Sequence, residues 1–412
     1  MRYLLFFISC VMLCCSCSDD DQKNTPTNPD TPTPPAQRTV IVYMSAENDL
    51  SSICTSDINE ILNGRKLVAA NENLVLFVDK ASMNEKPFIA KVTMNNKLDT
   101  LYRYEQDFYS SDPDYMASVI KRAVELCPAT EDYGLVLWGH ANGWIVEQDS
   151  IATNRAYGRD TGNNTPDPSK GKWLNMPSMR QVLESVGIHW KFIFCDCCNM
   201  MNVEVAYELR GLTDYLIGSP AEIPGNGAPY DTVVRDLFLR TENFYENIVD
   251  DYASAYPNRI PLSVIKADEE QMKTLADATR QVLQQVNNFV QTSNLQGYIY
   301  YSSVSSKTNS SQRYRIMFDM QEIVRKALAN DTEAYNIWYE TFNQTVVYSK
   351  FATTWMTNGS VTHSDFIMKE ENYGGVSMFI PHEMYAQAAV NHNEEIRKLA
   401  WYHAVGWSTV GW

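Results

Sequence analysis

Two segments of the sequence place reactive side chains directly after a run of apolar residues. In YGLVLWGHANGW the reactive residue is His140, and in FIFCDCCNMMNVEVAYELR the reactive residues are Asp196, Cys197 and Cys198. A thiol between the end of a strand and the first turn of a helix lies near the positive end of the helix dipole, which favours the thiolate. The second segment therefore predicts a nucleophilic Cys198.

The His140 segment supplies the base that such a thiol needs. Ends of neighbouring parallel strands lie about 4.8 Å apart, so an imidazole on one strand can meet a thiol on the next. His140 precedes Cys198 by 58 residues, close to the roughly 50 residues between the same two groups in caspases. A lone histidine at a strand end is more often structural, bonded to a backbone carbonyl, so the prediction depends on the pair. The remaining histidines have no partner at a diagnostic spacing and are expected to be structural: His189, His363, His382, His392 and His403.

Short apolar runs alternate with amphipathic stretches around both segments. The runs lack a polar face, which is typical of strands buried on both sides of a parallel sheet. Repeated strand and helix units predict an open α/β sheet with helices on both faces and a site at the carboxyl ends of its strands. Expected strands cover residues 39–44, 74–78, 134–138, 190–195 and 215–217, with a hairpin at 88–102 and helices at 56–62, 113–127, 179–186 and 201–212.

The sequence divides into four parts. Residues 1–16 read as a secretory signal, and residues 17–37 as a Pro/Thr-rich disordered tether. Residues 38–226 are expected to form the main core. After residue 227 the pattern becomes mainly helical, with helices expected at 230–238, 243–255 and 269–290 and strands at 297–302 and 376–381. This predicts a smaller C-terminal α/β portion, residues 227–412, packed on the core.

The N-terminal segment predicts export and a lipid anchor. It has one cation, Arg2, then about ten apolar residues and a cluster of cysteines. Its end resembles the lipobox of bacterial lipoproteins, with Cys17 as the favoured acceptor and Cys15 as the alternative. The acidic run at 19–21 resembles a surface-export signal of Bacteroides-like lipoproteins, although a merely solvated tether explains it equally well. The expected location is the bacterial outer membrane, at its periplasmic or outer face.

Composition excludes several classes of protein. A formal charge of -16 makes nucleic acid an unsuitable partner, and no apolar run reaches the roughly 18 residues of a spanning helix. Five cysteines remain beyond the signal and the acceptor, an odd number that leaves at least one free thiol. No second Cys/His pair stands at zinc-ligand spacing, so no metal is assigned to Cys195, Cys197 and Cys198.

The two reactive segments together resemble the clostripain family of cysteine peptidases, relatives of caspases, gingipains and legumains. Two further segments are similar to the family, SPAEIPGNGAPY at 219–230 and GGVSMFIP at 374–381. The resemblance therefore spans about 39–381. It implies a caspase-like sheet, Cys198 as nucleophile and His140 as general base and acid. It also implies an oxyanion hole formed by the N–H groups of Ala141 and Cys198, and Asp196 in a pocket selecting Arg or Lys. Peptide and protein substrates and a monomeric enzyme follow from the same resemblance.

The resemblance carries further expectations and two departures. Self-cleavage of the loop between the two segments is expected after one of its cations, and no cofactor is required for the chemistry. Ca²⁺ is allowed by similarity to clostripain, with Asp160, Asp167 and Asp196 as oxygen donors. The family usually has Gly at Ala141 and Ala or Gly at Cys197, which leaves open a surface lipoprotein that binds peptide or glycan without turnover, or a peptidase in which Asp196 only caps a helix. The candidate cleavage sites are Arg155, Arg159, Lys170 and Lys172.

Overall fold

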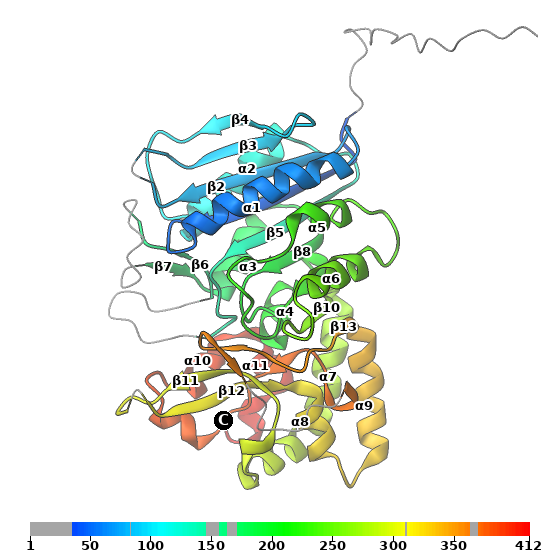
Figure 1. Cartoon of the computed structure of the whole chain (residues 1–412). Coiled ribbons are helices and arrows are strands. Elements are labelled where there is room, and N and C mark those ends of the chain that lie inside the picture. The colour runs from blue at the N-terminus through cyan, green and yellow to red at the C-terminus, as the bar shows by residue number, and fades with distance from the viewer. Residues whose placement is uncertain (1–34, 83, 146–155, 163–170, 310, 363–369) are drawn as a thin grey trace, which may run out of the picture. The chain divides into compact units, whose positions relative to one another are not determined.

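The computed structural model describes residues 35–82, 84–145, 156–162, 171–309, 311–362 and 370–412. Its centre is a nine-stranded sheet whose five middle strands, β9-β8-β5-β1-β2, run parallel, with antiparallel strands at both edges (Figure 1). In sheet order the strands are β13 (Val346–Lys350), β10 (Leu262–Lys266), β9 (Thr213–Gly218), β8 (Trp190–Asp196), β5 (Asp132–Gly139), β1 (Arg38–Ala46), β2 (Asn73–Lys80), β3 (Phe88–Val92) and β4 (Leu98–Arg103).

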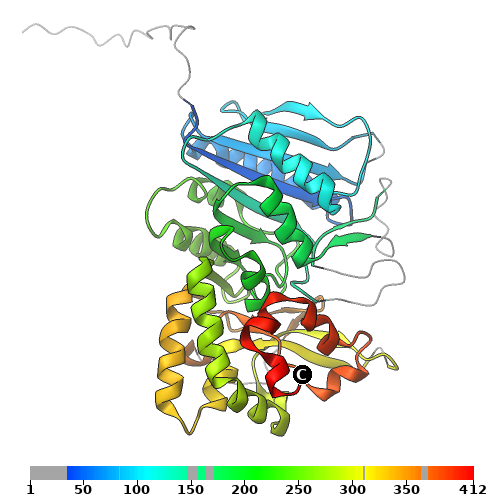
Figure 2. The ribbon, with the colours of Figure 1, turned by 180° about the vertical axis from the view of Figure 1, so that it is seen from behind.

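Helices cover both faces of this sheet, as the sequence predicts. Figure 1 shows α1 (Ser51–Gly64), α5 (Tyr230–Asp236) and α6 (Phe244–Ala255) on one face, and Figure 2 shows the opposite face. On that face lie α2 (Pro113–Leu126), α3 (Met176–Val186) and α4 (Val203–Leu209). Two buried apolar clusters fill the two sides. The predicted α/β architecture is confirmed.

Local signals explain where several elements begin and turn. Asp112 caps α2 by accepting from the N–H groups of Asp114 and Tyr115, and Pro113 occupies the first helical turn. The predicted hairpin is confirmed as β3 and β4, with Asn96 in the left-handed conformation at its turn. The predicted helix at 269–290 is confirmed as α7 (Glu269–Thr292).

The C-terminal half contributes to the same sheet and also forms a separate three-stranded sheet and a separate two-stranded sheet. Strands β10 and β13 lie beyond residue 226 and extend the main sheet, so the sheet runs across the division expected there. The strand expected at 376–381 is shorter, since only β16 pairs, with β12. The other C-terminal elements are β11 (Tyr300–Ser305), β12 (Arg313–Asp319), β14 (Trp355–Thr357), β15 (Ser360–Thr362), β16 (Ser377–Met378), α8 (Met320–Ala327), α9 (Thr332–Thr345), α10 (His392–Glu395) and α11 (Ala400–Val405).

A small antiparallel pair, β6 (Tyr157–Asp160) and β7 (Lys172–Leu174), follows the His140 segment. It is joined to that segment by hydrogen bonds from Gly158 N to His140 O and from Asn142 N to Ala156 O, both 2.9 Å. Within the described ranges, no helix is long and apolar enough to cross a membrane.

Candidate active site

His140 and Cys198 reach the same level of the sheet edge because of strand register. Strands β5 and β8 are parallel neighbours, and Trp138 pairs with Asp196. His140 and Cys198 each stand two residues beyond that pair. Both side chains line one cavity of about 200 Å³. The fold thus brings an imidazole and a thiol, distant in sequence, into one cavity.

Cys198 lies in a turn and not at the start of a helix. Asn199, in the left-handed conformation (φ 59°), redirects the chain, and α4 begins only at Val203, with Asn202 as its cap. The expected activation of the thiol by a helix dipole is therefore wrong, because α4 starts five residues after Cys198. Burial raises the pKa of Cys198 to about 12, opposed by a hydrogen bond from Ile223 N to Sγ at 3.4 Å. Burial at this position thus favours the neutral thiol of Cys198 over its thiolate.

His140 is held by a carboxylate that the sequence analysis missed. Its Nε2 lies 2.9 Å from Oδ1 of Asp49, three residues beyond β1, which is the sheet neighbour of β5. Arg159 Nη1 approaches the same oxygen at 3.4 Å. The hydrogen bond to His140 lowers the pKa of Asp49 to about 2. The signal available in the sequence was an acid a few residues past the end of the strand predicted at 39–44.

The backbone N–H groups of Ala141 and Cys198 belong to the two segments that carry the imidazole and the thiol. In the described part of the chain, no hydrogen bond is recorded from the N–H of Ala141 or of Cys198. The left-handed non-glycine residues of this part do not include Ala141, and the positive φ falls on Gly139, at 140°. Alanine in place of glycine at position 141 therefore introduces no backbone strain.

Asp196 forms a buried acidic wall of the same cavity. Its oxygens accept the hydroxyls of Tyr230 and Tyr252, each at 2.8 Å, and the N–H of Ala228 at 3.1 Å. Burial raises the pKa of Asp196, although these three donors lower it. A Cβ at Gly227 would lie 2.6 Å from Asp196 Oδ2, so a glycine is needed for this close approach.

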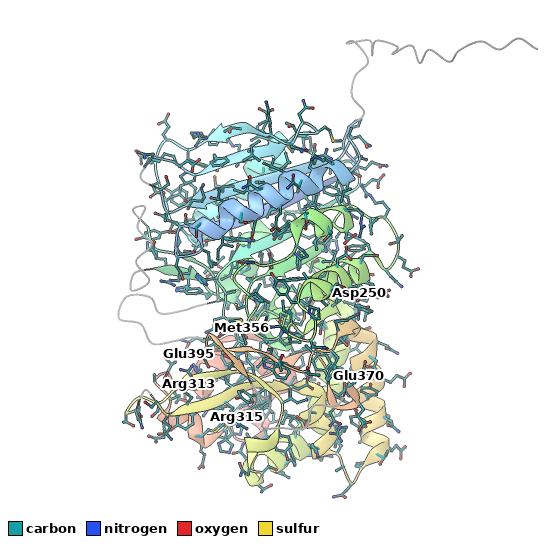
Figure 3. All side chains as sticks on the ribbon, in the orientation of Figure 1. Asp250, Arg313, Arg315, Met356, Glu370 and Glu395 are labelled. Atoms are coloured by element: carbon teal, nitrogen blue, oxygen red, sulfur yellow. The ribbon has the colours of Figure 1, made fainter. Side chains whose placement is uncertain are left out.

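The remaining wall is a loop braced by the C-terminal half. Ile223, Pro224 and Gly225 line the cavity. The preceding residue, Glu222, bridges to Met356 of β14, labelled in Figure 3, and accepts the N–H groups of residues 358 and 359 at 2.7 and 2.8 Å. The hairpin β14–β15 thereby fixes one side of the cavity.

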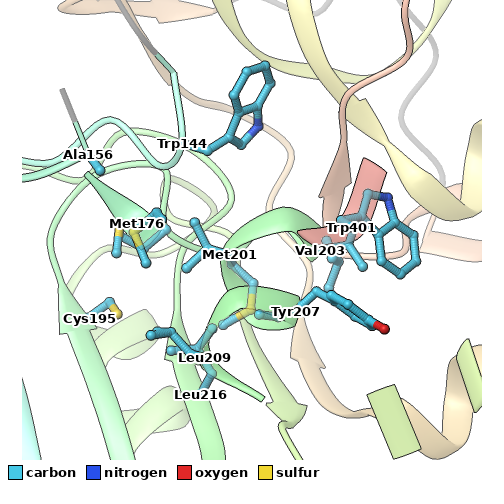
Figure 4. Close-up of a cluster of buried hydrophobic side chains, with 14 of the residues drawn as sticks. Trp144, Ala156, Met176, Cys195, Met201, Val203, Tyr207, Leu209, Leu216 and Trp401 are labelled. Atoms are coloured by element: carbon cyan, nitrogen blue, oxygen red, sulfur yellow. The ribbon is translucent and has the colours of Figure 1, made fainter. Parts of the chain in front are cut away.

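The neighbouring thiols point away from Cys198. Cys195 and Cys197 are buried in the apolar cluster on one face of the sheet, where Figure 4 shows Cys195 near Met201 and Leu216. Cys198 packs against the cluster on the other face. All five cysteines from Cys54 to Cys198 are free. The three thiols therefore do not converge on a metal.

The other residues singled out in the sequence are dispersed. Arg159 and Lys172 lie on the paired strands β6 and β7, whereas Arg155, Lys170, Asp167, Cys15 and Cys17 lie outside the described residues. Asp160 and Asp196 have separate partners, so the proposed Ca²⁺ set does not assemble from them. Among the other histidines, His189 contacts Asp214, His382 caps Met384, His403 contacts Arg397 O, His392 is buried, and His363 lies outside the described residues.

A thiol and an imidazole that line one cavity at the carboxyl edge of a largely parallel sheet are the kinds of groups that a cysteine peptidase uses. The model of the clostripain family, Peptidase_C11, matches residues 42–412. The chain belongs to the clostripain family and is a cysteine peptidase.

Solved structures agree with this assignment. A secreted C11 cysteine protease from Bacteroides thetaiotaomicron, in complex with an irreversible peptide inhibitor, is 27% identical, with a TM-score of 0.74 over 91% of this chain and 100% of that chain. An inactive zymogen C11 protease from Parabacteroides distasonis is 24% identical, with a TM-score of 0.71 over 90% and 98%, and shows the same fold. No curated protein sequence matches the chain.

Proposed function

We propose that this peptidase is an endopeptidase that cleaves after Arg or Lys through a Cys198–His140 dyad. The observation that carries the proposal is the single cavity lined by a thiol, an imidazole and a buried carboxylate. A similar protease holds a peptide inhibitor, which supports peptide substrates.

The proposed reaction starts from a neutral thiol. The Nε2–H of His140 donates a hydrogen bond to Asp49. Nδ1 then keeps a lone pair that can take the thiol proton. The sulfur of Cys198 attacks the scissile carbonyl, and the N–H groups of Ala141 and Cys198 stabilise the oxyanion. His140 then returns the proton to the leaving amine, giving a thioester. Water deprotonated by His140 attacks this thioester, the carbon–sulfur bond breaks to release the new carboxyl terminus, and the proton on His140 returns to the departing sulfur of Cys198.

Specificity is proposed to come from Asp196. Three donors hold its carboxylate in one orientation inside a cavity of about 200 Å³. A guanidinium or ammonium group entering this cavity would form a charge-assisted hydrogen bond that neutral side chains cannot form. In this proposal Asp196 is a pocket residue and not a helix cap, because α4 is capped by Asn202.

The N-terminal sequence supports export and lipidation at Cys17, with Cys15 as the alternative acceptor. The Pro/Thr-rich tether would then hold the peptidase some tens of Å from the outer membrane. The candidate self-cleavage sites are Arg155, Arg159, Lys170 and Lys172.

One labelling experiment tests these proposals together. The mature protein is treated with an acyloxymethyl ketone carrying Arg, and its intact mass is measured for the unchanged enzyme, Cys198→Ala and Cys197→Ala. We expect labelling and turnover of an Arg-linked chromogenic peptide to disappear only in Cys198→Ala, with turnover falling at least about 10³-fold. The same masses report a lipid on Cys17 and any cut in the loop. Turnover that survives Cys198→Ala would refute the dyad, and an unmodified N-terminal segment would refute the anchor.

A further inference from the structure

Three buried acids lie close together at the same edge of the sheet, on the face opposite to Asp196. Glu47 follows β1, Asp79 lies near the end of β2, and Asp160 ends β6. One oxygen of each lies within 4.8 Å of the others, and the three residues are at most 1% exposed. Such proximity of buried carboxyl groups requires a compensating partner.

Asp160 has protein donors. Its Oδ2 accepts the N–H and the hydroxyl of Ser110, at 2.5 and 2.7 Å, and its Oδ1 accepts the N–H of Gly162 at 2.9 Å. These bonds fix the carboxylate orientation within the cluster. Asp160 therefore presents a preformed oxygen ligand.

Asp79 is the opposite case. Neither of its carboxylate oxygens has a hydrogen-bond partner among the described residues, although the side chain is buried. Burial, followed by the charges of Asp160 and Glu47, raises the pKa of Asp79 well above its ordinary value. A buried, unpartnered carboxyl group facing two other acids needs either a proton or a cation.

We propose that Glu47, Asp79 and Asp160 form a binding site for a hard divalent cation such as Ca²⁺ or Mg²⁺. The three ligand groups are all carboxylates, which these cations prefer, and the cluster offers no nitrogen or sulfur ligand for zinc or copper. The unpartnered oxygens of Asp79 become ligands, and water completes the coordination. Of the acids expected from sequence to bind Ca²⁺, this site includes only Asp160.

The bound cation would join three segments that position the catalytic imidazole. It would link the ends of β1 and β2 to β6. From β6, Gly158 N donates to His140 O, and Arg159 contacts Asp49, the partner of His140. Glu47, Asp79 and Asp160 are thus positioning residues, and the site is a stabilising element on the histidine side of the cavity.

The test measures metal binding without using activity. Mature protein freed of metal with EDTA is titrated with Ca²⁺ or Mg²⁺ while its thermal midpoint is followed, and with Tb³⁺ while sensitised luminescence is followed. Tyr43 donates to the carbonyl of Ser110, which holds Asp160, so it lies close enough to sensitise Tb³⁺. At about one hundred times Kd we expect a rise of about 3–5 °C, with competition between Tb³⁺ and the preferred cation.

Asp79→Asn should weaken cation binding by about 10-fold or more while stabilising the metal-free protein, because a neutral amide removes the repulsion. The matched control is Asp236→Asn, which changes another fully buried carboxylate paired with Arg235 and should leave the cation response intact. Glu47→Gln is the second variant if Asp79→Asn does not fold. No thermal shift and no Tb³⁺ signal in the unchanged protein would overturn the proposal in favour of a proton shared by the acids. An equal loss in Asp236→Asn would also overturn it.

Discussion

Asp196 and Asp79 are two buried carboxyl groups near the same edge of one sheet, and their surroundings are opposite. Strand alternation places them on different faces, since Phe194 and Phe77, each two residues earlier, belong to different apolar clusters. Asp196 accepts hydrogen bonds from three donors, whereas no donor to Asp79 is found in the part of the chain that the structure describes. The difference lies in the donors that pack against each acid.

This contrast distinguishes two uses of a buried acid. Donors around Asp196 stabilise its charged form in place, which suits a pocket that receives a cationic side chain and releases it again. The carboxyl group of Asp79 lies beside two other acids and accepts no hydrogen bond from a described residue. Such surroundings suit a site that retains a cation. Asp196 and Asp79 are both buried, and they differ in the hydrogen-bond donors around them.

The largest expected effect comes from removing the charge of Asp196. Asp196→Asn should lower kcat/KM for an Arg substrate by about 10²- to 10⁴-fold and leave a neutral substrate nearly unchanged, because only the charge-assisted bond is lost. The matched control is Asp57→Asn, which alters a nearby acid that accepts Trp138 Nε1 at 2.7 Å. Unchanged ratios between Arg and neutral substrates would refute the pocket assignment.

A smaller effect is expected from removing one donor of Asp196. Tyr252→Phe deletes a hydrogen bond to the charged carboxylate, so the pKa of Asp196 should rise further. The acid limb of kcat/KM for an Arg substrate should then move to higher pH, with about a 3- to 10-fold loss on that limb. Tyr256→Phe is the control, because Tyr256 donates to Gly227 O instead. A profile that moves equally in both variants would contradict the role of the donor.

Glu204 is intermediate between the two acids, and the smallest effect is expected there. Its Oε1 accepts the N–H of Phe379 at 2.7 Å, while Oε2 has no partner among the residues that the structure describes, and burial raises the pKa of Glu204 to about 8. The folded protein then holds a proton that the unfolded chain loses above about pH 4.5, so this contribution to stability is complete below that pH and is lost as pH rises through 8.

Glu204→Gln should flatten this dependence and make the protein about 1–2 kcal/mol more stable above pH 8. Urea unfolding at pH 5 and pH 8.5 measures the change. Glu184→Gln is the control, because the side chain of Glu184 is 47% exposed and pairs with Arg180 at 2.8 Å. Parallel pH dependences for Glu204→Gln and the unchanged protein would contradict the buried neutral acid.

The sequence predicts the elements that carry the site because their signals are local. Unbroken apolar runs before His140 and Cys198 predict parallel strands, and Asp112 with Pro113 predicts the start of α2. The helix after Cys198 was expected too early because the apolar pattern of 201–212 does not reveal the turn at Asn199. Asp49 was missed because its role depends on β1 lying beside β5, a contact between segments about 90 residues apart.

The sequence by itself determined the order of strands and helices, the family, and the two segments that supply thiol and imidazole, because hydrophobic periodicity and motif spacing are written along the chain. Only the tertiary structure decided which acids surround His140, which donors hold Asp196, and that Glu47, Asp79 and Asp160 share one buried space. Those pairings depend on strand register and on the face to which each side chain points, which change with a shift of a single residue.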